Sequence, residues 1–392
     1  MKRRVALLIE TSSAYGRDLL SGVLRFMRTH DEWSVFLEQR DLWKKPPGWL
    51  TDWQGDGIIS RATTPALLEA VRRNTVPLVD TTDRHGETTV PAVRSDDAAI
   101  GRMAAEHLLD RGYQHFGFCG FKGEAWSVRR EQAFVEVIRS RNGADCRIFN
   151  SRWHGPLAQP WEVEQDDLLH WLRQFDAPFA VMGCNDVRGQ QIIDACSKLE
   201  LSVPEQAAVL GVDNDDLLCR ICSPPLSSVI PNATLVGYRA AETLSNLMQG
   251  IDVGCQPQLI KPLEVAIRQS TDVVAIGDRR IAAAVGFIRQ HACRGLSVEE
   301  VVSHAAISRS TLERQFRSYF QRTPQQEIRR VQVKRAKELL ISSELPAERI
   351  AIRCGFEHPE YFYVVFKRLV GCTPCKFRQQ RKPKPSSEGD KI

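Results

Sequence analysis

The sequence lacks a run of 18 apolar residues anywhere in its 392 positions, so it offers no helical segment long enough to cross a membrane. The apolar stretch near the N-terminus, Val5 to Ile9, is too short for the hydrophobic region of a signal peptide, and Glu10 follows it directly. We therefore expect no membrane-spanning helix and no secretory leader, and we expect a cytoplasmic protein.

Motifs of common enzyme sites are also missing. The first two thirds contain no glycine-rich phosphate loop of either standard spacing, no GxSxG turn and no HExxH pair. The CxxC spacings Cys219–Cys222 and Cys372–Cys375 each lack the second local pair of ligands that a zinc site needs. Eleven cysteines, an odd number in a long chain, favour free thiols. We expect no metal, no cofactor and no enzymatic activity, with an enzyme as the competing class.

Charge, by contrast, is plentiful and unevenly distributed. Residues 279–392 contain 23 Lys and Arg against 11 Asp and Glu, a balance of +12. Residues 1–278 contain 30 against 37, a balance of −7. A basic segment attached to an acidic one is typical of a polyanion-binding module joined to a domain with another role.

Short apolar runs alternate with helical patterns up to about residue 268. Buried strands that are each followed by a helix indicate parallel sheets covered on both faces, and about 265 residues of this kind suit two lobes. Ligands of such sheets bind at the carboxyl ends of the strands. The predicted strands are 5–10, 33–38, 57–60, 76–80, 115–120, 179–184 and 207–213, and helical patterns include 15–28, 97–112 and 131–141.

The last third contains an internal repeat. LSVEEVVSHAAISRSTLERQFRSYFQRTP (296–324) matches LPAERIAIRCGFEHPEYFYVVFKRLVGCTP (345–374) at an offset of 49, which becomes 50 after one inserted residue. Each copy has a short helix, a tight turn and a second helix with aromatic and basic residues, as in a helix-turn-helix motif. Ser308 is placed to cap the second helix. A connecting helix at 324–341, about 27 Å long, suits two recognition helices in successive major grooves about 34 Å apart.

The end of the second copy, FEHPEYFYVVFKRLVGCTPCKFR (356–378), resembles the AraC/XylS-type DNA-binding domain, which covers about a quarter of the chain. Pro359 departs from the family, in which a polar residue is more usual near the start of the second recognition helix. The resemblance implies three groups of DNA-binding residues. They are Ser308, Ser310, Glu313 and Arg314 in the first module, His358, Glu360, Tyr361 and Val364 in the second, and Arg309, Arg317, Lys367 and Arg368 at phosphates.

The first 270 residues resemble the lac-repressor and periplasmic sugar-binding fold. RSDDAAIGRMAAEHLLDRGYQHFGFCG (94–120) is similar to the crossover between its lobes, FAVMGCNDVRG (179–189) to its strand with Asn-Asp, and VLGVDNDDL (209–217) to its Gly-x-Asp turn. No DNA-binding headpiece precedes Val5, and Pro231 replaces a common glutamine contact. Planar polar groups and an aromatic ring would hold a sugar. The resemblance implies that they include Ser13, Tyr15, Arg17, Trp126, Arg130, Asn185, Asp186 and Asp213.

The expected protein is a sequence-specific transcription regulator, controlled by a monosaccharide and activating sugar catabolism genes, with xylose as the first candidate. Its expected partners are operator DNA, a second copy of itself and RNA polymerase. Two alternatives stay open: the first domain senses another small molecule, or it only dimerises. Each sugar-site residue also has a plainer interpretation as a surface charge or helix cap. The expected architecture is a two-lobed α/β sensor domain with parallel sheets (1–270), a linker (271–278), an all-α domain with two helix-turn-helix motifs (279–380) and a disordered tail (381–392).

Overall fold

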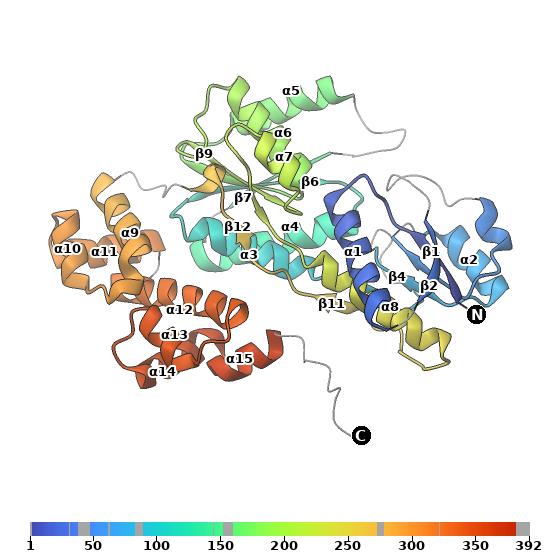
Figure 1. The fold of residues 1–392 in the computed structure, drawn as a ribbon. Helices are drawn as coiled ribbons and strands as arrows, with labels where there is room; N and C mark the ends of the chain where they lie inside the picture. The colour runs from blue at the N-terminus through green and yellow to red at the C-terminus, as the bar shows by residue number, and fades with distance from the viewer. Residues whose placement is uncertain are drawn as a thin grey trace, which may run out of the picture. The chain divides into compact units, whose positions relative to one another are not determined.

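The chain divides into two compact units, Met1–Val273 and Val274–Ile392 (Figure 1). Residues 273–277 of the expected linker and the expected tail from 382 onward lie outside the described residues. The computed structural model describes residues 2–30, 32–37, 48–61, 63–82, 89–143, 145–151, 160–272, 278–320 and 322–381.

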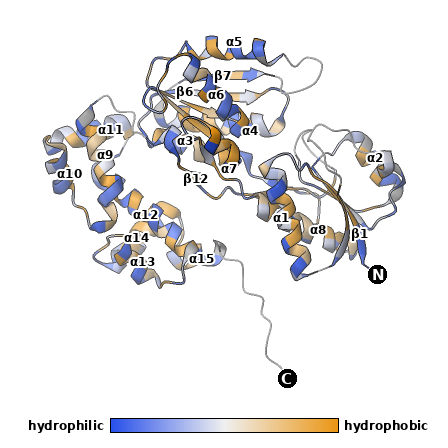
Figure 2. Ribbon diagram, turned by 45° about the horizontal axis from the view of Figure 1, so that its top comes forward, coloured by the Kyte–Doolittle hydropathy of each residue, from blue (hydrophilic) through white to orange (hydrophobic). Residues whose placement is uncertain are grey.

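The first lobe of the N-terminal unit is built on a parallel sheet with strand order β2-β1-β3-β4. Alternate residues of β1 face opposite sides: Val5 and Leu7 pack under α1 and α8, whereas Ala6 and Leu8 pack towards α2. The amphipathic pattern of α1 is visible in Figure 2. The elements are β1 (Arg3–Leu8), β2 (Trp33–Leu37), β3 (Gly57–Ser60), β4 (Leu78–Asp80), α1 (Ala14–Thr29), α2 (Pro65–Asn74) and α8 (Ala233–Met248).

The second lobe has a six-stranded sheet of order β12-β10-β9-β8-β6-β7, in which only β12 runs antiparallel to its neighbour. Phe179 and Val181 of β8 pack with Ile192 and Ile193 of α6 on one face. Its strands are β6 (His115–Phe121), β7 (Cys146–Ser151), β8 (Phe179–Gly183), β9 (Ala207–Val212), β10 (Ser227–Val229) and β12 (Val265–Ala266). Its helices are α3 (Asp97–Leu109), α4 (Ala125–Asn142), α5 (Trp161–Leu172), α6 (Asp186–Lys198) and α7 (Asp216–Ile221).

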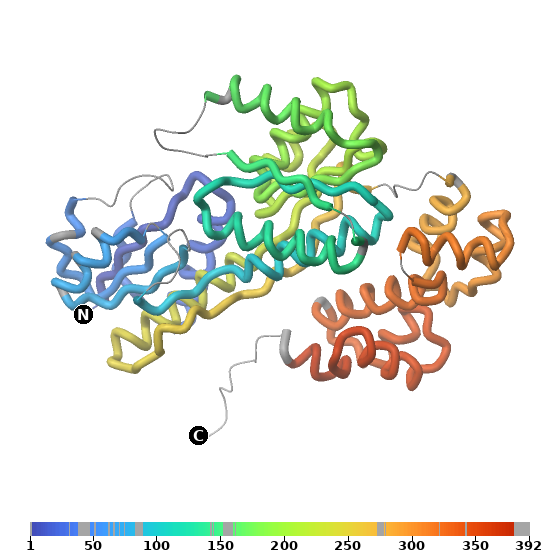
Figure 3. The backbone as a smooth tube through the Cα atoms, turned by 180° about the vertical axis from the view of Figure 1, so that it is seen from behind, coloured from blue at the N-terminus to red at the C-terminus, as the bar shows by residue number. Residues whose placement is uncertain are grey.

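Three crossings connect the lobes. The chain passes from β5 (Val93–Ser95) to α3, from β10 back to α8, and from β11 (Gln258–Ile260) to β12. β5 and β11 pair in parallel, so two of the crossings start side by side. Figure 3 shows the yellow segment around α8 beside the blue first lobe, although it is distant in sequence. The two-lobed architecture with parallel sheets confirms the predicted fold class.

The C-terminal unit consists of helices arranged around two hydrophobic cores. Leu312 and Phe316 belong to the first core, Phe362 and Phe366 to the second, as the repeat predicts. Pro359 occupies the first turn of α14, where proline is compatible with a helix. Its helices are α9 (Arg279–His291), α10 (Val298–Ala305), α11 (Arg309–Phe320), α12 (Pro324–Ser342), α13 (Ala347–Arg353), α14 (Pro359–Val370) and α15 (Pro374–Arg381).

α12 belongs to both cores. Ile328 packs in the first core, whereas Val333, Ala336 and Leu340 pack in the second. Between them, Gln332 is fully buried, and its Nε2 donates to the carbonyl oxygen of Ala292 at 2.9 Å and of Gly355 at 3.1 Å. One side chain thus ties the two helix-turn-helix modules together.

Candidate functional site

A cavity of about 800 Å³ lies between the lobes of the N-terminal unit. Its walls include the residues that follow β1, β3, β4, β8 and β9, so it opens at the carboxyl ends of the strands, as parallel sheets predict. The structure brings together at this cavity all eight residues that sequence analysis assigned to sugar binding: Ser13, Tyr15, Arg17, Trp126, Arg130, Asn185, Asp186 and Asp213.

Arg130 reaches the cavity from α4 and is held by two protein acceptors. Its Nε donates to Oδ1 of Asp97 at 2.9 Å, and its Nη1 donates to the carbonyl oxygen of Cys184 at 2.6 Å. The guanidinium carbon lies 4.9 Å from the ring centre of Trp126. Burial alone would lower the pKa of Arg130, but the carboxylates of Asp97 and Asp213 raise it. Arg130 is therefore a fixed, permanently charged fork, suited to neighbouring hydroxyl groups.

Asp213 follows β9 in a strained turn. Its φ of 106° and the φ of 52° at Asn214 both lie in the region that favours glycine, at a typical cost of about 1–3 kcal/mol each. Burial raises the pKa of Asp213 to about 6, although Arg130 and Arg61 oppose this rise. A glycine would adopt this backbone conformation without strain, but only the aspartate places a carboxyl group at the cavity wall.

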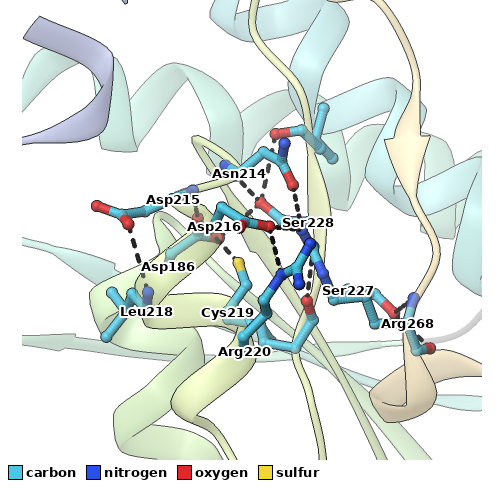
Figure 4. A network of polar contacts seen from close by, with 12 residues as sticks. Asp186, Asn214, Asp215, Asp216, Leu218, Cys219, Arg220, Ser227, Ser228 and Arg268 are labelled. Atoms are coloured by element: carbon cyan, nitrogen blue, oxygen red, sulfur yellow. Dashed lines mark hydrogen bonds and ion pairs between the residues drawn. The ribbon is translucent and has the colours of Figure 1, made fainter. Parts of the chain in front are cut away.

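Asp186 also lines the cavity, but both of its oxygens accept from protein donors (Figure 4). Oδ1 accepts from the Ser228 hydroxyl at 2.6 Å, and Oδ2 accepts from the Asp215 amide at 2.8 Å and the Cys219 thiol at 3.4 Å. Burial, followed by the neighbouring Asp213, raises the pKa of Asp186 to about 8. These contacts anchor the turn after β9.

Two of the predicted sugar ligands also cap helices, which is the plainer interpretation of such residues. The Ser13 hydroxyl accepts from the Gly16 amide at 3.0 Å and donates to Glu10 at 2.7 Å. Oδ1 of Asn185 accepts from the Arg188 amide at 3.0 Å, which leaves its Nδ2 as the remaining polar atom.

Tyr15 and Arg17 extend from the start of α1. The Tyr15 hydroxyl lies 2.9 Å from the Ser95 hydroxyl. Arg17 donates to two carbonyl oxygens of the turn after β1 and lies 3.7 Å from Asp215 of the opposite lobe. Arg17 therefore spans the two walls of the cavity.

Several cavity residues were not predicted. Glu10, which is buried, forms an ion pair with the half-buried Arg61. Because the two residues follow β1 and β3, inspecting every strand end would have found them. Asp97 is buried and gave no such signal, because its role depends on its contact with Arg130. Others that line the cavity are Thr81, Thr82, Arg94, Ser95 and Asp215.

The first recognition helix, α11, exposes polar and basic groups. Ser310, Arg314 and Arg317 are exposed. Arg309 is paired with Glu299 at 2.6 Å and with Glu313 at 3.1 Å. The Ser308 hydroxyl accepts from the Thr311 amide at 3.2 Å, which confirms the predicted cap.

The second recognition helix, α14, has a different exposed face. Tyr361 and Val364 are 46% and 62% exposed, and the Arg329 guanidinium carbon lies 5.0 Å from the Tyr361 ring centre. The remaining predicted DNA-binding residues of this module are also exposed, namely His358, Glu360, Lys367 and Arg368.

Neither CxxC spacing forms part of a metal-binding group in the described part of the chain, where no cluster of three or more His, Cys, Asp or Glu is arranged around one point. All eleven cysteines are free thiols. Within the same described residues, no helix is both long and apolar enough to span a bilayer.

Comparison with known proteins places the chain in a family. Three family models match: XylR N-terminal domain at residues 4–94, periplasmic binding protein-like domain at 105–271, and helix-turn-helix domain at 301–380. The xylose operon regulatory protein of Escherichia coli K12 is 30% identical over 387 residues, covering 96% of this chain and 97% of its own. The Haemophilus influenzae protein of the same name is 29% identical over 383 residues, covering 96% and 98%.

A solved structure described as the xylose-binding transcription activator XylR matches with a TM-score of 0.61 and 28% identity, covering 98% of this chain and 99% of that one. The fold and these matches define a DNA-binding transcription regulator with a periplasmic-binding-protein-like sensor domain, not an enzyme. The chain belongs to the family of the xylose operon regulatory proteins.

Proposed function

We propose that this regulator binds a monosaccharide in the cavity of its N-terminal unit, with xylose as the first candidate, and thereby activates sugar catabolism genes. The observation that carries the proposal is the convergence of Arg130, Asp213 and Asn185 from three separate segments on one cavity. Relatives whose names refer to xylose support the choice of sugar.

Calorimetry of the full chain with a panel of pentoses and hexoses tests the sugar. We expect xylose to bind, and Asp213→Ala and Arg130→Ala each to lose about 2–3 kcal/mol, as for a hydrogen bond to a charged group. Asp194→Ala, outside the cavity lining, is the control. All variants should still bind DNA. If no sugar binds, the first unit senses another molecule or only dimerises. If both variants bind xylose like the parent, the site lies elsewhere.

Retardation of double-stranded DNA by the full chain, with sites selected from a random pool, tests the second activity. The basis is the +12 balance of residues 279–392 and the two modules on α12. Binding should weaken steeply with salt. Arg314→Ala should cost about 1–3 kcal/mol and relax preference at one base position, because a guanine fork is lost. Lys367→Ala should weaken all sequences alike. No retardation at low salt would refute DNA binding.

We further propose that the protein acts as a homodimer on two pairs of half-sites and that the DNA-bound form contacts RNA polymerase. The repeated module supports paired half-sites on each chain, and a dimer doubles them. Light scattering of the protein with its selected DNA should show two chains per site. Transcription in vitro with purified RNA polymerase should increase when xylose is added. One chain per site, or no increase, would argue against these two points respectively.

A further inference from the structure

The two recognition helices can be compared position by position. Leu312 and Phe316 of α11 and Phe362 and Phe366 of α14 are all fully buried and stand 50 residues apart. Arg314 and Val364 are also 50 residues apart. Because the buried positions match at this offset, these two residues occupy equivalent places on the outer faces of the two helices.

The chemistry at this shared position differs. Arg314 is exposed among polar and basic groups, as expected of a helix that contacts DNA. Val364 is 62% exposed, whereas its neighbour Val365 is buried in the core of the module. Tyr361 precedes it by one turn and Lys367 follows by one turn on the same face. An exposed aliphatic group therefore stands in the middle of the surface proposed to face DNA.

The surroundings of Val364 include three basic residues and one exposed carboxylate, Glu360, one turn before it on α14. Arg329 of α12 lies 5.0 Å from the ring centre of Tyr361 and 5.2 Å from that of Phe356, so it holds the tyrosine ring against its module. Lys367 and Arg368 form the basic end of the same face. Arg329, Lys367 and Arg368 outnumber Glu360 around the apolar spot formed by Tyr361 and Val364, which favours a negatively charged partner such as DNA over another protein.

In the major groove, the 5-methyl group of thymine is the apolar feature that distinguishes one base pair from the others. We propose that Val364 recognises a thymine methyl group, at the position of the second half-site that corresponds to the base contacted by Arg314 in the first. The two modules then differ in base preference, guanine against thymine, although their backbones are equivalent. This inference rests on the proposed DNA binding and names the base that the second module reads.

Replacing thymine by uracil removes only the methyl group, so it tests the contact directly. Sites are selected from random DNA with the full chain, and each thymine of the second half-site is then replaced singly by uracil. At one position we expect a three- to tenfold loss of affinity at constant salt. Val364→Ala should bring that thymine-to-uracil ratio close to one, and Val364→Thr, which retains one methyl, should give an intermediate ratio.

Two variants serve as controls. Leu369 is also aliphatic and 48% exposed, but it lies about 140° around α14 from Val364. Leu369→Ala should therefore keep the thymine-to-uracil ratio of the parent. Arg314→Ala should also keep this ratio while it relaxes the guanine preference of the first half-site.

The outcomes separate this inference from the proposed function. If the parent binds selected DNA but no uracil replacement matters, or if Val364→Ala keeps the full ratio, the thymine contact is wrong and DNA binding stands. If Val364→Ala leaves DNA affinity and the ratio intact but lowers transcription by RNA polymerase, the apolar spot is a protein contact and the inference is overturned. If the parent selects no DNA at low salt, the proposed function itself fails.

Discussion

Asp97 binds two arginines at once, one oxygen to each. Oδ1 accepts from Nε of Arg130 at 2.9 Å, and Oδ2 accepts from Nη2 of Arg129 at 2.8 Å. Arg130 has little freedom to reorient, because Cys184 holds its other end. Asp97 therefore acts through Arg130 as a positioning residue of the cavity.

Asp97→Asn should weaken sugar binding by about 1–3 kcal/mol, because the fork of Arg130 loses a charged acceptor. Titration calorimetry measures the affinity, and circular dichroism checks that the variant is folded. Glu131→Gln is the matched control, since Glu131 lies on α4 and binds Asn150 instead. Equal affinities for Asp97→Asn and the parent would show that the orientation of Arg130 does not depend on Asp97.

The raised pKa of Asp186 predicts a pH dependence of stability. The ordinary pKa of this carboxyl is 3.8, and in the folded protein it rises to about 8 through burial and the neighbouring Asp213. Between these values the folded state keeps a proton that the unfolded chain releases, so stability falls as pH rises. The contribution is complete below about pH 4 and is lost by about pH 8.

Melting temperatures of the sugar-free protein should thus decrease from pH 5.5 to pH 8.5. Asp186→Asn, which cannot ionise, should show a shallower decrease over the same range. Parallel curves for the two proteins would mean that Asp186 titrates near its ordinary value in the folded state.

At the scale of elements, α12 couples the two modules through Gln332. Replacing Gln332 by Leu would leave the carbonyl oxygens of Ala292 and Gly355 without this donor in a buried place. We expect a loss of about 1–3 kcal/mol in the free energy of unfolding of the C-terminal unit. Gln325→Leu, at an exposed position of the same helix, should change it by less than about 0.5 kcal/mol. Chemical denaturation measures both, and equal effects would contradict the role of Gln332.

The elements differ in how well the sequence predicts them. β3 and β8 consist of apolar runs followed by a helix. α12 begins at its expected residue, because Pro324 suits a first helical position, and it ends one residue after its expected end. β7, β5, β10, β11 and β12 were not predicted. β7 is an edge strand without a buried apolar run, so its six residues gave no strand signal. The other four have two or three residues each, too few for a periodic pattern. They form where the chain crosses between lobes, so tertiary pairing rather than local preference creates them.

The same limit applies to the cavity. Arg130 and Asp213 could be assigned from their places in the motifs, but Asp97 could not, because its partners lie 32 and 33 residues later. Asp186 was assigned to the sugar alone, whereas its acceptor Oδ1 binds Ser228, 42 residues away. Hydrogen bonds between residues far apart in the sequence thus decide which polar atoms of the cavity remain available to a ligand.

At the scale of the whole molecule, the cavity proposed to bind a sugar in one unit and the DNA-binding helices in the other must influence each other if the sugar regulates transcription. Xylose can shift DNA binding only as far as it prefers one arrangement of the protein over another. By linkage, the factor by which xylose changes the DNA affinity must equal the factor by which DNA changes the xylose affinity.

We expect this factor to lie between about 5 and 150, the usual range for coupled sites. Fluorescence anisotropy with labelled DNA gives one side of the cycle, and calorimetry with xylose gives the other. At sugar concentrations that saturate the parent, xylose should hardly change the DNA affinity of Asp213→Ala, because the variant then binds little sugar. A factor of one in the parent would show that the two sites are independent and that the sugar acts after DNA is bound.

The shared helix α12 also limits how regulators with this architecture can diverge. One residue inserted into it would turn the second module by about 100° and advance it by about 1.5 Å, whereas one base pair turns DNA by about 35° and advances it by about 3.4 Å. A one-residue insertion in the helix therefore matches no whole number of base pairs, and it would also break the contacts of Gln332. New target sites must arise from substitutions on the outer faces of α11 and α14. The operators of related regulators should therefore keep the same length while their base sequence changes.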